Sequence, residues 1–106
     1  MTVIDVDPGI CGFVSRVSVV SEDGQMCKVR VATGCESVKA LVDELGELDS
    51  FDVAFKNFSE NPVYLAASKH YKHAACPLPS AIIKAVEIEC HLALPKEVRF
   101  TPKEEE

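Results

Sequence analysis

Cysteines are the residues of this chain whose type and position could do chemistry, and three of the five stand where regular structure is predicted to break. Cys11 lies in a loop between glycines, Cys35 directly follows a glycine, and Cys76 precedes a proline. Glycine neighbours let the backbone approach a bound ion closely. Cys35 and Cys76 also precede predicted helices, whose free amide groups favour the thiolate form, and thiolate is both a nucleophile and a metal ligand. We therefore predict a site built from Cys11, Cys35 and Cys76; the alternative is that three small residues fall at turns by chance.

The other two cysteines follow apolar patterns. Cys27 alternates with Val29 and Val31 in a predicted strand. Cys90 lies one turn beyond Val86 in a predicted helix. Because a buried free cysteine behaves as a small hydrophobic residue, we expect Cys27 and Cys90 in the core. This division accounts for an odd number of cysteines without any disulfide.

Two histidines precede the third cysteine of the predicted site. His70 and His73 are three residues apart, and His73 is three residues before Cys76. Three cysteines with one histidine are a common tetrahedral zinc set, so His73 is the predicted fourth ligand and His70 an additional candidate. An exposed histidine at a helix end is the alternative, and it applies above all to His70. His91 is distant in sequence and is expected to face solvent.

Composition excludes several classes of protein. The chain has 106 residues, 47% of them hydrophobic, which is enough to bury a core. Its net charge of −6 and its lack of a basic stripe argue against a nucleic-acid partner. It has no apolar run of the roughly 18 residues that a membrane span needs, so we expect no membrane association. The first residues lack the basic and apolar regions of a secretory signal, and a reducing cytoplasm is therefore expected.

Apolar spacing predicts the elements that must position the cysteines. Alternating valines predict strands at 3–6, 13–20 and 27–31, the last two forming a hairpin. Helical spacing predicts helices at 38–45, 51–55, 62–71 and 78–92. A last strand is expected over 98–101. Strands followed by helices indicate a single α+β domain over 1–101, with a small antiparallel sheet of about three strands and helices on one face, and an acidic disordered tail over 102–106.

Three sequence segments together resemble a known family. They are Cys11-Gly12, then Val31-Ala32-Thr33-Gly34-Cys35-Glu36-Ser37, then Ala75-Cys76 shortly before Ala81-Ile82-Ile83-Lys84-Ala85. Over about residues 8–92 the chain resembles the U-type iron–sulfur scaffold domain, the IscU and NifU amino-terminal family. The resemblance implies a three-stranded antiparallel sheet packed by helices, with three cysteines converging at one end. It also implies that Cys11, Cys35 and Cys76 hold an iron–sulfur cluster or Zn²⁺, and that the partners are iron–sulfur assembly or recipient proteins.

The chain departs from this family near its cysteines. Phe13 stands two residues after the first cysteine, where the family usually has aspartate. Ala75 precedes the third cysteine, where the family usually has histidine. The Leu-Pro-Pro-Val-Lys segment read by the family's chaperone is absent. The chain is also similar to small uncharacterised proteins of anaerobic microbes with the same Cys-Gly and Cys-Pro elements, a likeness that implies no activity.

Three classes of function fit these residues. The leading hypothesis is a non-enzymatic metal-binding protein that holds an iron–sulfur cluster or zinc. The second is a thiol enzyme or redox sensor in which Cys35 or Cys76 is the nucleophile and His73 its base. It lacks a Cys-x-x-Cys pair and an identifiable oxyanion hole. The third is an interaction module whose cysteines are structural and whose acidic surface recruits a partner.

Overall fold

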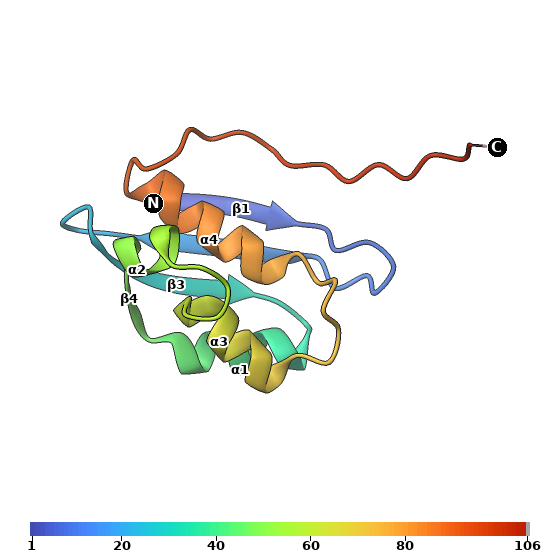
Figure 1. Ribbon diagram of the computed structural model, residues 1–106, viewed down its shortest axis with the longest axis horizontal. Helices are drawn as coiled ribbons and strands as arrows, with labels where there is room; N and C mark the ends of the chain where they lie inside the picture. Colours follow the sequence, from blue (N-terminus) through green and yellow to red (C-terminus); the bar gives the residue numbers. More distant parts are fainter. Residues whose placement is uncertain (106) are drawn as a thin grey trace.

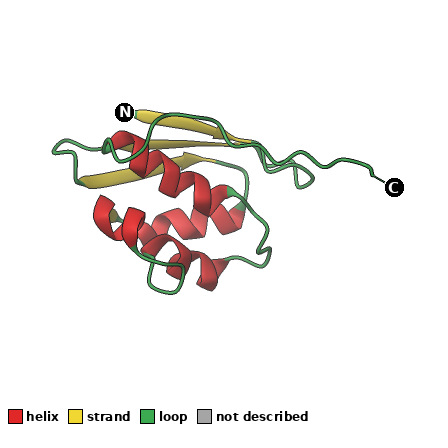
Figure 2. Cartoon of the chain, turned by 45° about the horizontal axis from the view of Figure 1, so that its top comes forward, coloured by secondary structure: helices red, strands yellow, loops and turns green. Residues whose placement is uncertain are grey.

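A four-stranded antiparallel sheet with helices on one face forms the computed structural model, which describes residues 1–105 (Figure 1). The strands are β1 (Thr2–Val6), β2 (Ser15–Val20), β3 (Met26–Ala32) and β4 (Glu47–Asp49), in that spatial order. The helices are α1 (Glu36–Leu45), α2 (Ser50–Phe55), α3 (Pro62–His70) and α4 (Leu78–Glu89). Figure 2 shows all four helices on the same side of the sheet. The predicted α+β class is therefore confirmed.

Alternation along the central strands decides which sheet face is buried. Val17 and Val19 of β2 are fully buried, and so is Cys27 of β3. Lys28 and Arg30, between the apolar positions of β3, are exposed. Because side chains alternate across a strand, this register gives the sheet one face toward the helices and one toward solvent. The burial of Cys27, and of Cys90 at the end of α4, confirms the expectation that these two cysteines belong to the core.

Two predictions about strands were wrong. The sheet has a fourth strand, β4, whose three residues pair with Met26–Lys28. Three residues are too few to display an alternating pattern, so this strand had no signal of its own. The strand expected over 98–101 does not form, and Val98 and Phe100 are exposed in the segment that runs beside β1 (Figure 1). A segment with alternating apolar residues forms a strand only where a neighbouring strand supplies hydrogen bonds, and this segment pairs with none of the described strands.

The predicted helices are all present with small differences at their ends. α1 buries Val38 and Leu41 and ends at Gly46, whose positive φ of 59° suits glycine. α4 starts directly after Cys76-Pro77, as expected, but it ends at Glu89. Leu92 therefore lies beyond the helix rather than on its buried face. Within residues 1–105, no helix is long and apolar enough to cross a membrane. The predicted acidic tail has no regular structure over 102–105, and Glu106 lies outside the described residues.

Asn61 joins the end of α2 to the start of α3. Its buried side-chain amide donates to the carbonyl oxygens of Val53, at 2.7 Å, and Lys56, at 3.2 Å. Its Oδ1 accepts from the Val63 amide at 3.1 Å, which caps α3. One side chain thus satisfies three backbone groups at a helix–helix junction.

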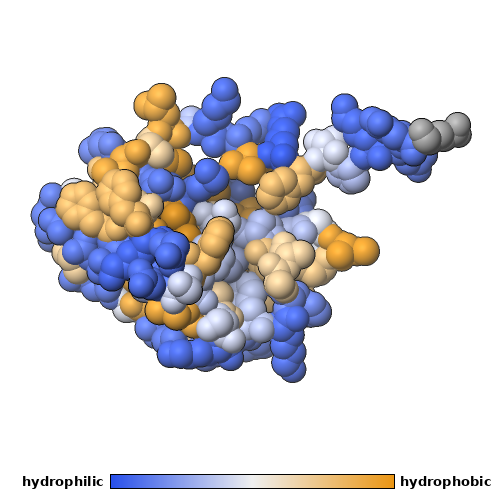
Figure 3. Space-filling view, in the orientation of Figure 1, coloured by the Kyte–Doolittle hydropathy of each residue, from blue (hydrophilic) through white to orange (hydrophobic). Residues whose placement is uncertain are grey.

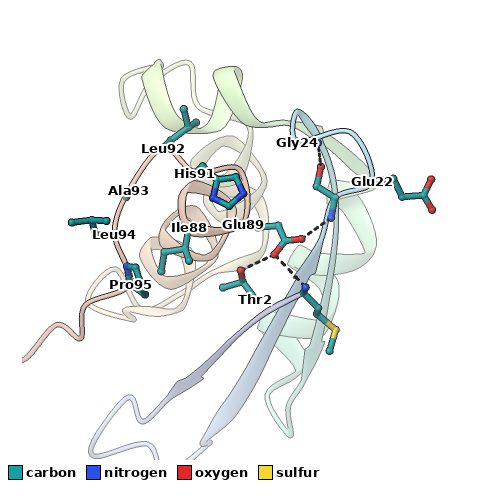
Figure 4. Close-up of a pocket in the computed structure, with 12 residues that line it drawn as sticks. Thr2, Glu22, Gly24, Ile88, Glu89, His91, Leu92, Ala93, Leu94 and Pro95 are labelled. Atoms are coloured by element: carbon teal, nitrogen blue, oxygen red, sulfur yellow. Dashed lines mark hydrogen bonds and ion pairs between the residues drawn. The ribbon is translucent and has the colours of Figure 1, made fainter.

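Glu89 joins the end of α4 to the sheet (Figure 4). Its carboxylate accepts from the Thr2 hydroxyl at 2.7 Å and from the Ser21 amide at 3.1 Å, and it pairs with the Met1 ammonium at 3.5 Å. Burial raises the pKa of Glu89, but the contacts with Thr2, Ser21 and the ammonium outweigh it and leave the pKa below its ordinary value. The charged form therefore stabilises the fold.

Replacing Asn61 tests the helix junction. We expect Asn61→Ala to lower the free energy of unfolding by about 2–4 kcal/mol, because buried backbone groups lose their partners. Urea unfolding followed by circular dichroism measures the change. Ser59→Ala removes only the exposed hydrogen bond to Asn57 and serves as the control, with an expected loss under about 0.5 kcal/mol. Equal effects of the two variants would contradict this role of Asn61.

The Glu89 contacts predict a pH dependence. Because its pKa is lower in the folded state, Glu89 contributes stability above the ordinary glutamate pKa, and this contribution is lost as pH falls through the folded-state pKa. We expect Glu89→Gln to be less stable than the wild type at pH 7 by about 1–2 kcal/mol and the difference to shrink toward pH 3. Urea unfolding across this pH range measures the gap. Glu87→Gln, on the same helix, should leave the pH profile unchanged; a gap for Glu89→Gln that stays constant with pH would refute the account.

Candidate functional site

The segments that carry Cys11, Cys35 and Cys76 lie at one end of the sheet, on the right in Figure 1. Antiparallel pairing produces this arrangement, because the end of β1, the start of β2 and the end of β3 are neighbours. Cys11 lies between β1 and β2, and Cys35 lies between β3 and α1. Cys76 lies just before α4, whose first turn is at the same end of the molecule (Figure 1).

Cys35 is the N-cap residue of α1 and is half-buried. Its amide donates to the Thr33 hydroxyl at 3.1 Å, and the Ser15 hydroxyl bonds the same oxygen at 2.8 Å. Its carbonyl accepts from the Lys39 amide at 3.1 Å, which is the first hydrogen bond of the helix. The thiol makes no capping bond, so the backbone is held by these contacts while the sulfur is left available at a helix N-terminus.

Cys76 closes a short turn before α4 and is also half-buried. Its amide donates to the His73 carbonyl at 3.3 Å. Its thiol donates to the Tyr71 hydroxyl, with 3.8 Å between sulfur and oxygen. The turn therefore places the sulfur beside a phenol rather than in open solvent.

Tyr71 interacts with two of the three predicted cysteines. Burial and the hydrogen bond with Cys76 raise the pKa of the Tyr71 phenol well above its ordinary value, and the charges of Cys76 and Cys35 raise it further. Tyr71 therefore contacts Cys76 directly and is affected by the charge of Cys35, although the two cysteines are 41 positions apart in sequence (76 − 35). Tyr71 is a residue of the candidate site that the sequence pattern missed. Its only signal was its place between His70 and His73.

Cys11 lies apart, on an exposed turn. The turn is closed by a hydrogen bond of 3.0 Å from the Gly12 amide to the Gly9 carbonyl, with both glycines at positive φ. Phe13 fixes the base of the loop, because its ring lies so close to Gly34 that a Cβ on that glycine would stand 3.2 Å from it. The ring thus joins the Cys11 loop to the segment that carries Cys35. This packing accounts for an aromatic residue at position 13.

The three predicted cysteines do not form a ready-made metal site. Among residues 1–105, no three side chains of His, Cys, Asp or Glu are grouped closely enough to hold one ion. The structure places Cys76 against Tyr71 and Cys35 within reach of the same phenol through its charge, and it leaves Cys11 on an exposed turn. The donor set of thiols and imidazole suits zinc or iron–sulfur centres, and these side chains would have to move closer together to complete it.

The histidines have separate surroundings. His70 places Nε2 2.8 Å from Glu44 Oε1, and Lys69 bonds the other oxygen of the same carboxylate at 3.2 Å. These two contacts lower the pKa of Glu44, and the hydrogen bond with His70 has the larger effect. His73 is exposed in the turn that ends at Cys76. His91 is exposed as expected, and it lies beyond α4 at a positive φ of 60°.

Comparison with known proteins identifies the family of the chain. No curated protein and no solved structure matches the chain. The model of the family of unknown function DUF6951 matches residues 2–101, so the chain belongs to this family.

Proposed function

We propose that Cys11, Cys35 and Cys76 bind a thiophilic metal centre, Zn²⁺ or an iron–sulfur cluster, at the end of the sheet where β1 and β3 finish. The observation that carries this proposal is that Cys35 and Cys76 both act on the Tyr71 phenol, Cys76 by direct contact and Cys35 through its charge. Two cysteines near one phenol, beside a turn that carries a third cysteine, offer the thiolates of a metal ligand set. Zinc and iron–sulfur centres are the metals that such soft ligands select.

His73 is the proposed fourth ligand. Its carbonyl and the Cys76 amide close the same turn, so its imidazole starts from the backbone segment that holds a sulfur ligand. His70 is a weaker candidate, because its Nε2 already bonds Glu44. The Cys11 turn supplies the third sulfur, and its exposure leaves it free to approach the other two.

Delivery of the metal to another protein is the finer proposal. Exposed apolar side chains surround the Cys11 turn: Ile10, Phe13 and Val14. Figure 3 shows apolar surface at the tip of this loop. Exposed apolar groups beside a site are typical of a surface that contacts a partner protein. They support transfer of a cluster to a recipient protein, in line with the resemblance to U-type scaffolds, and a reducing cytoplasm would keep the thiols available.

Metal reconstitution tests the ligand set. We expect the wild type, incubated anaerobically with iron and sulfide or with Zn²⁺ and then desalted, to retain metal near one site per chain. Cys35→Ser and Cys76→Ser should lose most of it, because each removes a thiolate. Metal analysis and visible absorption measure the content. Cys90→Ala, which removes a buried thiol away from the site, should retain wild-type content. Metal at trace level in the wild type, or full content in Cys35→Ser, would overturn the proposal.

Three histidine variants test the fourth ligand. We expect His73→Ala to weaken Zn²⁺ binding at least about tenfold, since even residues that only orient a ligand cost about 10–100-fold when removed. His70→Ala should leave the affinity unchanged and lower stability only slightly, because the lost pair with Glu44 is at the surface. His91→Ala is the matched control. Competition with a chromophoric chelator measures affinity; a loss confined to His70→Ala would assign the ligand to that residue instead.

A further inference from the structure

Cys27 and Cys90 form a second pair of sulfurs, at the opposite end of α4 from Cys76. Cys27 belongs to β3 and Cys90 is the C-cap residue of α4. Their Sγ atoms lie 3.2 Å apart, although the residues are 63 positions apart in sequence. Both side chains are buried, Cys27 completely. The fold therefore holds two free thiols in contact across the boundary between sheet and helix.

We propose that Cys27 and Cys90 are an oxidisable pair that forms a reversible disulfide when the protein meets a peroxide or a disulfide oxidant. A disulfide bond is about 2.05 Å long, so the sulfurs need to approach by only about 1.2 Å. Such a change is within the range of small side-chain rotations. None of the other cysteines is required, because Cys11, Cys35 and Cys76 lie at the other end of the sheet (Figure 1).

Cys90 is the more accessible residue of the pair. Cys90 retains 8% of its surface exposed, whereas Cys27 has none. Glu89 and His91, which flank Cys90, line a hollow at the end of α4, together with Ser21 and Gly24 of the β2–β3 turn (Figure 4). Of the two cysteines, Cys90 is therefore the one that a small oxidant at this end of α4 meets first.

The two thiols therefore have different parts in the reaction. The Cys90 sulfur, as thiolate, attacks a peroxide oxygen; a sulfur–oxygen bond forms, the oxygen–oxygen bond breaks, and one water leaves after protonation. The Cys27 sulfur then attacks the sulfenic acid at Cys90, forming the disulfide and releasing a second water. Two thiols supply two electrons and two protons, which reduce one hydrogen peroxide to two waters.

The contact between the two sulfurs suits Cys27 to the second step. Burial, then the contact with Cys90, raises the pKa of the Cys27 thiol to about 12. Cys27 is therefore protonated at neutral pH, and its proton leaves with the hydroxyl group of the sulfenic acid as water when the disulfide forms. Its thiol also makes a weak bond of 3.9 Å to the Gln25 carbonyl. Once Cys90 is oxidised, Cys27 is the thiol in contact with it.

A disulfide at this place would join the sheet to the helix that covers it. Cross-linking residues far apart in sequence restricts the unfolded chain more than the folded one. We therefore expect the oxidised protein to unfold at a temperature higher by at least about 10 °C than the reduced protein. Dithiothreitol should reverse the shift.

Peptide mapping tests the proposal, because trypsin places the five cysteines in five different peptides: 1–16, 17–28, 31–39, 73–84 and 85–96. The folded wild type is treated with hydrogen peroxide or with glutathione disulfide, alkylated in denaturant and digested without reductant. We expect a cross-linked species of 17–28 with 85–96, which dithiothreitol separates. A triple variant, Cys11→Ser with Cys35→Ser and Cys76→Ser, should give the same species and the same shift in Tm.

Each other outcome decides against the pair. Peptides 17–28 and 85–96 that remain separate and alkylated would overturn the proposal. So would oxidation of 85–96 to sulfinic or sulfonic acid without a cross-link, or a cross-link that forms only in denaturant. Cys27→Ser and Cys90→Ser should each abolish the Tm shift. If either variant fails to fold, the mapping of the wild type still decides the question. None of these outcomes bears on the proposal that Cys11, Cys35 and Cys76 bind a metal, which has its own test.

Discussion

Burial of the inner sheet face beneath α4 is the constraint on which both cysteine groups depend. Val17 and Val19 of the sheet and Ile82 and Val86 of α4 are completely buried, and each such side chain contributes about 1.5–3 kcal/mol. The same helix also contacts α2 and α3. With twelve residues, α4 is about 18 Å long, and it carries a cysteine just beyond each end. The position of α4 therefore sets where Cys76 and Cys90 lie, and keeps the two groups apart.

Antiparallel pairing supplies the partners at each end of α4. The hairpin of β2 and β3 returns the chain to the end at which β1 finished, so the segment of Cys35 lies beside the Cys11 loop, at the end of the molecule where α4 begins (Figure 1). Cys27 stands at the opposite end of β3 and meets Cys90. Cys11, Cys35 and Cys76 are exposed or half-buried, whereas Cys27 and Cys90 form a buried pair. The first group suits exchange with species in solution, and the second is protected from all but small reagents.

Strong periodic patterns made most of the fold predictable. The alternation around Cys27 and the helical spacing from Leu78 to Val86 each report a buried face, and both elements are present. β4 was missed because its three residues carry no period, and a strand at 98–101 was expected from an alternation that has no partner. Whether a short or alternating segment becomes a strand depends on its neighbours in the fold, and the spacing of apolar residues does not encode those neighbours.

The candidate site was predictable only in part, for a related reason. Glycine and proline marked the breaks where Cys11, Cys35 and Cys76 lie. Nothing in the spacing indicated that Tyr71 would contact Cys76, or that the Phe13 ring would pack against Gly34. The 3.2 Å contact between Cys27 and Cys90 was equally hidden, since two apolar patterns predict burial and not which buried side chains meet.

X-ray absorption at the zinc edge of the zinc-loaded protein tests the central claim most directly, because it counts the ligand atoms. The account predicts three sulfur neighbours at about 2.3 Å and one nitrogen at about 2.0 Å. It also predicts that one sulfur is lost in Cys11→Ser. A shell of oxygen and nitrogen alone, or a sulfur count unchanged in that variant, would contradict a metal centre built from Cys11, Cys35 and Cys76.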